Sequence, residues 1–104
     1  MAILIDIDGT ETEVKPDDGK SFHLEQLYKL LECDMVELQM LGEGVHPAGP
    51  QMIMDEEGKL TGKETNEKAT KLWAKTHDLT VGQLMAHGDH IVGKVLICSR
   101  GEFR

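Results

Sequence analysis

The chain has 104 residues, of which 39% are hydrophobic and 29% are charged, and this composition is that of one ordinary globular domain spanning residues 1–104. Its formal net charge of −8, with 11 basic against 19 acidic residues, argues against general nucleic-acid binding, because such binding depends on neutralising phosphates. No apolar run is long enough to cross a bilayer and no secretory leader pattern opens the sequence, so we expect a cytoplasmic protein without membrane attachment.

The chain opens with a pattern that is typical of a β-hairpin. Alternating isoleucines in residues 3–7 share one face of an extended segment, and the dipeptide Asp8-Gly9 suits a tight hairpin turn. Residues 10–14 alternate β-branched and acidic side chains, which predicts a second, half-exposed strand.

The next two segments differ in their hydrophobic period. Residues 24–31 carry apolar side chains at helical spacing, and Ser21 is in position to cap this helix. The apolar stripe consists of Leu24, Leu27, Tyr28 and Leu31. Residues 35–41 return to strict alternation and predict a third strand, with Glu37 and Gln39 on its polar side.

Residues 42–50 contain three glycines and two prolines, which predicts an irregular loop. A loop of this length exceeds the usual hairpin connection and indicates a candidate binding loop, in which His46 is the candidate contact residue. The alternative is a simple mobile connection. Residues 51–54 then predict a fourth strand, which a turn over residues 55–58 closes.

The second half of the chain predicts helical segments followed by a strand. Thr65 or Asn66 is in position to cap a helix whose apolar stripe falls within residues 69–76, and a short helical turn is expected around residues 81–85. Residues 91–98 are strongly β-prone and predict a central strand. Together these segments predict an α+β fold, with a mostly antiparallel sheet of about five to six strands and two main helices packed on one of its faces.

The first candidate for chemistry is an acidic pair near the start of the chain. Residues 3–10, an apolar stretch followed by Asp6, Asp8, Gly9 and Thr10, resemble the DxDGT signature of the haloacid-dehalogenase phosphotransferases. The resemblance implies that Asp6 would attack a phosphoryl group and Asp8 would act as acid or base, with Mg²⁺ held by both. That chemistry needs further residues from a parallel sheet, which the antiparallel signals do not favour. We therefore favour a hairpin turn and keep a Mg²⁺-dependent phosphohydrolase as the alternative.

A second candidate is the pair His87 and His90. Their spacing would place two imidazoles on one side of a helical turn, as zinc binding requires. Gly88 interrupts such a helix, and paired CxxC or HxxxH spacings are absent from the sequence. We favour a polar turn that enters the last strand and keep a zinc-binding module as a further alternative. No metal or cofactor is otherwise expected.

Basic residues gather in the second half of the chain and form a third candidate. If the second helix and the last strand lie side by side, four of these residues would converge on a pocket for a small anion. They are Lys68, Lys71, Lys94 and Arg100. The alternative is a solvated helix face, on which Glu64 and Lys68 are spaced for an i,i+4 ion pair.

Several short strings carry a family resemblance. They are residues 5–10, 55–60, 66–70, 72–73 and 89–93. In these strings the chain resembles a bacterial and phage family designated domain of unknown function 3846. The resemblance implies a small α+β fold and frequent residence on phages or other mobile elements, and it implies no established activity. Asn66, Thr70 and Trp73 would line a site, the alternative being that Asn66 is a helix cap and Trp73 a core residue.

From these observations we expect a small, acidic, non-enzymatic binding protein, such as a phage or mobile-element factor. It would either occlude a host protein or sequester a small phosphorylated, nucleotide-like ligand, and the net charge favours the first version. Exposed strand edges and a methionine-rich apolar set favour a homodimer. The expected ligand-binding residues are Asn66, Thr70, Trp73, Lys68, Lys71, Lys94, Arg100 and His46.

Overall fold

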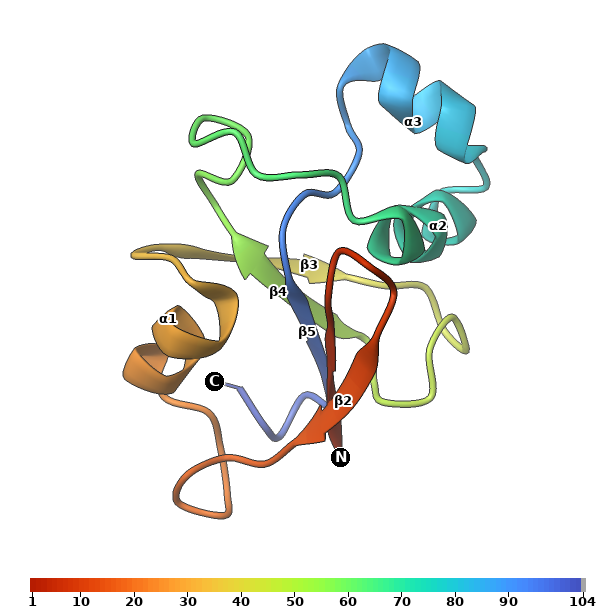
Figure 1. Ribbon diagram of the computed structural model, residues 1–104. Helices are drawn as coiled ribbons and strands as arrows, with labels where there is room; N and C mark the ends of the chain where they lie inside the picture. The colour runs from red at the N-terminus through yellow and green to blue at the C-terminus, as the bar shows by residue number, and fades with distance from the viewer. Residues whose placement is uncertain (104) are drawn as a thin grey trace.

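Five strands form one antiparallel sheet in the computed structural model, which describes residues 1–103 (Figure 1). The elements are strands β1 (Ala2–Ile5), β2 (Glu11–Val14), β3 (Val36–Met40), β4 (Gln51–Asp55) and β5 (Val95–Cys98), and helices α1 (Leu24–Leu31), α2 (Glu67–Thr76) and α3 (Val81–His87). The strand order is β2-β1-β5-β4-β3, and every neighbouring pair is antiparallel. The predicted α+β class is confirmed, and the helical turn expected near residues 81–85 is a third helix. Across the described residues, no helix is long and apolar enough to cross a membrane.

Helices α1 and α2 cover opposite faces of the sheet, whereas we expected both main helices on one face (Figure 1). Leu27 of α1 lies in one buried cluster with Ile53, and Ala69 of α2 lies in the other with Met52. The reason is in the central strands, because every residue of β4 and β5 is buried. Alternate side chains of a strand point to opposite faces, so two apolar faces need cover.

The last strand is shorter than expected. It begins at Val95, whereas the sequence predicts a strand from residue 91. Gly93 interrupts the extended backbone just before the strand begins. Its φ is +73°, a conformation that favours glycine. A Cβ atom at this position would lie 2.9 Å from Cδ of Lys63, so a larger residue would force the Lys63 side chain to shift.

The start of α1 also differs from the prediction. His23 occupies the N-cap position, where Ser21 was expected, and it makes no side-chain cap. The Asp18 carboxylate accepts the backbone N–H groups of Ser21 at 3.0 Å and Lys20 at 2.8 Å. Ser21 therefore belongs to the turn that precedes the helix.

Candidate functional site

The acidic string at the start of the chain forms the turn of the β1–β2 hairpin. Ile5 pairs with Glu11 across the antiparallel strands, so Asp6 and Asp8 lie in the connection between them. Asp6 Oδ1 accepts the N–H of Ile7 at 2.7 Å, and Asp8 Oδ1 accepts the N–H of Thr10 at 2.8 Å. The same Thr10 N–H lowers the pKa of Asp8 below its ordinary value. These contacts favour the hairpin-turn interpretation, since within residues 1–103 the sheet has no parallel pair.

The two histidines proposed for zinc lie on either side of a helix end. His87 is the last residue of α3 and is exposed, and Gly88 ends the helix with a φ of +72°. In the described part of the chain, no group of three or more His, Cys, Asp or Glu side chains is placed to hold a metal ion. A zinc site at this position would have to recruit ligands from elsewhere.

The four basic residues expected to build an anion pocket do not line one shared cavity of the described chain. Lys68 binds Glu11 of β2, and Lys94 donates to Glu32 at 2.8 Å. The Lys94 ammonium lowers the pKa of Glu32 below its usual range. Lys71 and Arg100 are exposed and have no ion-pair partner within residues 1–103. The four basic residues are therefore dispersed, and Lys68 and Lys94 are already paired with carboxylates.

His46 joins three segments of the chain. Its Nδ1 accepts the backbone N–H of Ala48 at 3.0 Å, which leaves the ring proton on Nε2 to be donated to Glu11 at 3.1 Å. Glu11 also binds Lys68 of α2, so one carboxylate connects loop 42–50, strand β2 and helix α2. The side chain of His46 is only 11% exposed, and its role in this structure is to fasten the loop.

This junction predicts a pH effect on stability. Hydrogen bonds from Lys68 and His46 lower the pKa of Glu11 below its ordinary value of 4.5. A carboxylate with a lowered pKa stabilises the fold above its unfolded-state pKa, and that contribution is lost as the pH falls through the folded-state value. The wild type should lose free energy of unfolding between about pH 5 and pH 3. We expect this loss, measured by urea unfolding, to be smaller in Glu11→Gln. Glu13→Gln, on the same strand, should keep the wild-type pH dependence, and an equally reduced loss in both variants would contradict this role.

Asn66 and Thr70 form a buried structural network and do not line an open site. Both side chains are 0% exposed. Asn66 Oδ1 accepts the N–H of Ala69 at 3.0 Å as the cap of α2, and its Nδ2 donates to the carbonyls of Ile5 at 3.1 Å and Gly93 at 2.9 Å. Thr70 Oγ1 donates to the carbonyl of Asn66 at 2.8 Å. The helix-cap alternative for Asn66 is the one that the structure supports.

A groove of about 600 Å³ lies between strands β3 and β4 and helices α2 and α3. Its volume lies within the range of small-ligand pockets. We call it the acidic groove. Its ionisable and aromatic lining consists of Glu37, Asp55, Glu56, Lys59, Trp73, His77, Asp89 and His90. The groove therefore combines negative charge with aromatic surface.

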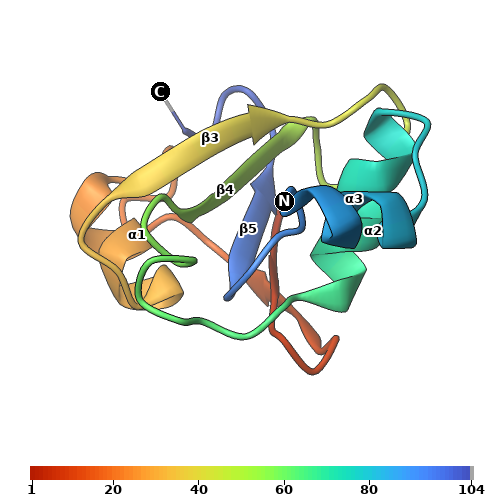
Figure 2. The same cartoon turned by 90° about the horizontal axis from the view of Figure 1, so that it is seen from above.

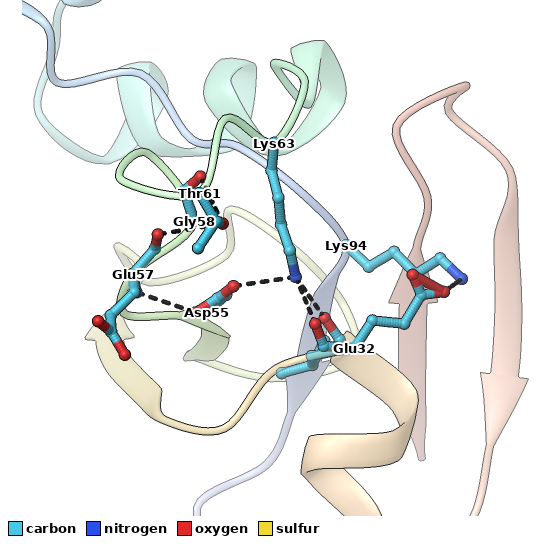
Figure 3. Close-up of polar contacts among 8 residues, drawn as sticks. Glu32, Asp55, Glu57, Gly58, Thr61, Lys63 and Lys94 are labelled. Carbon is cyan, nitrogen blue, oxygen red and sulfur yellow. Dashed lines mark hydrogen bonds and ion pairs between the residues drawn. The ribbon is translucent and has the colours of Figure 1, made fainter.

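Four carboxylates and one lysine set the charge of the acidic groove. Asp55 is already neutralised, because its Oδ2 lies 2.9 Å from Nζ of Lys63 (Figure 3). The Lys59 ammonium donates a hydrogen bond to the carbonyl of Gly88. Within residues 1–103, no cationic side chain pairs with the other three carboxylates, which are Glu37, Glu56 and Asp89. The groove thus keeps an excess of uncompensated negative charge.

The aromatic side of the groove has two rings in contact and a histidine with an unpaired ring nitrogen. The rings of Trp73 and His77 meet edge to face, with centroids 4.2 Å apart. His90 Nδ1 is buried and has no hydrogen-bond partner among the described residues. A buried polar atom without a partner is rare and costs about 1–3 kcal/mol, so this nitrogen lowers the stability of the groove wall.

Of the eight predicted binding residues, only Trp73 lines the acidic groove. The sequence does place Glu37 on the polar side of its strand, but it contains no signal that Asp89 and Glu56 would face the same cavity. These residues come from segments far apart in the chain, which only the fold brings together. The sequence suggests His90 only as a metal ligand.

Comparison of the chain with protein-family models, with curated proteins and with solved structures finds no match. The function of the acidic groove must therefore be inferred from its own residues.

Proposed function

We propose that this chain is a non-enzymatic binding protein whose acidic groove receives a basic segment of a partner protein. The observation that carries the proposal is the excess of carboxylates over cations in the groove lining. Three of these carboxylates, Glu37, Glu56 and Asp89, have no ion-pair partner within residues 1–103. A lysine or arginine side chain would supply the missing charge.

The other groove residues suit the same ligand. Trp73 lines the groove, and the face of an aromatic ring attracts an ammonium or guanidinium group through the ring quadrupole. Leu60 and Leu79, which also line the groove, offer exposed apolar surface. Together these residues favour a cationic and partly apolar segment over a phosphorylated ligand, which the carboxylates would repel.

The charge of the whole chain supports this choice. A net charge of −8 draws a basic partner toward the protein and makes association faster at low ionic strength. If the resemblance to the phage and bacterial family holds, the partner is a host protein that the chain occludes in the host cytoplasm. Binding should then weaken as salt is added.

Calorimetric titration with a short peptide of alternating arginine and alanine tests the proposal. We expect the double variant Glu56→Gln/Asp89→Asn to bind this peptide about tenfold more weakly than the wild type, because it removes two uncompensated carboxylates from the groove. The control Glu13→Gln/Glu25→Gln removes the same charge from exposed positions outside the groove and should bind nearly as the wild type does. Equal weakening in both double variants would mean general charge attraction alone, and no binding by the wild type would reject the groove as a cation site.

A further inference from the structure

Strand β3 is an open edge of the sheet (Figure 2). The N–H of Leu41 donates to the carbonyl of Pro50 at 2.7 Å, and the carbonyl of Met35 accepts the N–H of Glu56 at 3.1 Å. Backbone groups of an antiparallel strand point alternately to its two sides. The N–H and carbonyl groups of the odd-numbered residues in this segment therefore point toward β4. The N–H and carbonyl groups of Val36, Leu38 and Met40 therefore point to the open side, where no described segment pairs with them.

The side chains of β3 leave apolar surface beside this edge. Leu38 and Met40 are each 41% exposed, and Leu38 lies opposite Ile53, on the face covered by α1. Glu37 and Gln39 lie on the other face and line the acidic groove. The strand has no proline, lysine or bulge to keep its edge from pairing, and Glu37 is its one charged side chain.

We infer that β3 pairs antiparallel with β3 of a second copy of this chain, about a twofold axis at Leu38. In this register Leu38 lies opposite Leu38 and Val36 opposite Met40, so the apolar side chains of the two copies adjoin on one face. Each of these residue pairs exchanges two backbone hydrogen bonds, because their N–H and carbonyl groups point outward in both copies. The result is one continuous sheet through both copies.

The same register is complementary on the polar face. Glu37 of each copy lies opposite Gln39 of the other, so no carboxylate faces a carboxylate and an amide can donate to each acid. Within one chain, Gln39 Nε2 already donates to Glu37 at 3.2 Å, which shows that the two side chains are long enough to meet. Twofold pairing preserves the faces of the sheet, so it places two acidic grooves side by side on one surface. The inference does not depend on what the grooves bind.

Sedimentation velocity over a wide range of protein concentration tests this inference. The wild type should show a concentration-dependent dimer, because a five-residue strand pair is a small interface of the transient kind. We expect Gln39→Lys to tighten the dimer roughly tenfold and Gln39→Glu to weaken it roughly tenfold, since each change acts twice across the axis. Met85→Lys and Met85→Glu, at an exposed position of α3, repeat the charge changes away from β3 and should shift the dimer much less.

A second substitution addresses the edge directly. Leu38→Lys would bring two ammonium groups together at the axis, and its partly exposed position lets the monomer fold normally, as circular dichroism can check. We expect this variant to remain monomeric where the wild type dimerises. A wild type that is monomeric at every concentration overturns the inference, and so does a dimer that persists in Leu38→Lys or responds equally to charge at positions 39 and 85.

Discussion

Replacing Asn66 with alanine is expected to lower the free energy of unfolding by about 3–4 kcal/mol, through loss of a helix cap and of two buried hydrogen bonds. The carboxamide is fully buried and makes contacts with three backbone segments. Its Oδ1 accepts the N–H of Ala69, while its Nδ2 donates to the carbonyls of Ile5 and Gly93. Alanine leaves all three backbone groups buried without these partners.

Urea unfolding of two further variants separates the parts of this effect. Asn66→Ser keeps a hydroxyl oxygen for the cap but removes both amide donors, so it should recover part of the lost stability. Thr80→Ala removes an exposed cap, that of α3, and should cost only about 1 kcal/mol. If Asn66→Ala cost no more than Thr80→Ala, the buried carboxamide would contribute nothing beyond an ordinary cap.

Asn66 also shows how far the sequence predicts local structure. Its position before a helical stripe predicts an N-cap, and the structure confirms this. Its amide donates hydrogen bonds to the carbonyls of Ile5 and Gly93, which lie 61 and 27 positions away in the sequence. No local pattern reveals these contacts. Likewise, Asp8-Gly9 predicts the hairpin from local geometry alone, and β1 and β2 confirm it.

Non-local structure explains what the sequence does not predict. Residues 51–54 form an uninterrupted buried stretch, which indicates a strand but not that helices cover both of its faces. The acidic groove depends on that arrangement, because Glu37 reaches it through the pairing of β3 with β4, and Trp73 through the packing of α2 on the same face. The dispersion of the lysines has the same cause, since Lys68 and Lys94 pair with acids that lie far away in sequence, Glu11 and Glu32.

Lys63 is the second residue whose replacement should have a large effect, because it joins helix α1 to strand β4 (Figure 3). Its ammonium donates to the carbonyls of Leu31 and Glu32 at 2.8 Å each and lies 2.9 Å from Asp55. The two carbonyls are at the C-terminal end of α1, where the helix dipole favours a cation. The Asp55 side chain is only 6% exposed, so it depends on Lys63 for its counter-charge.

We expect Lys63→Met to lower the free energy of unfolding by about 3 kcal/mol, because it leaves the Asp55 carboxylate buried without a cation. Lys94→Met is the matched control, since Lys94 pairs with a Glu32 side chain that is 65% exposed, and it should cost less than about 1 kcal/mol. Adding Asp55→Asn to Lys63→Met removes the unpaired buried carboxylate and should restore part of the stability. Urea unfolding of the complete double-mutant cycle measures this effect as a coupling energy. Additive losses in that cycle would mean that the two side chains stabilise the fold independently and that the α1–β4 junction does not rest on their ion pair.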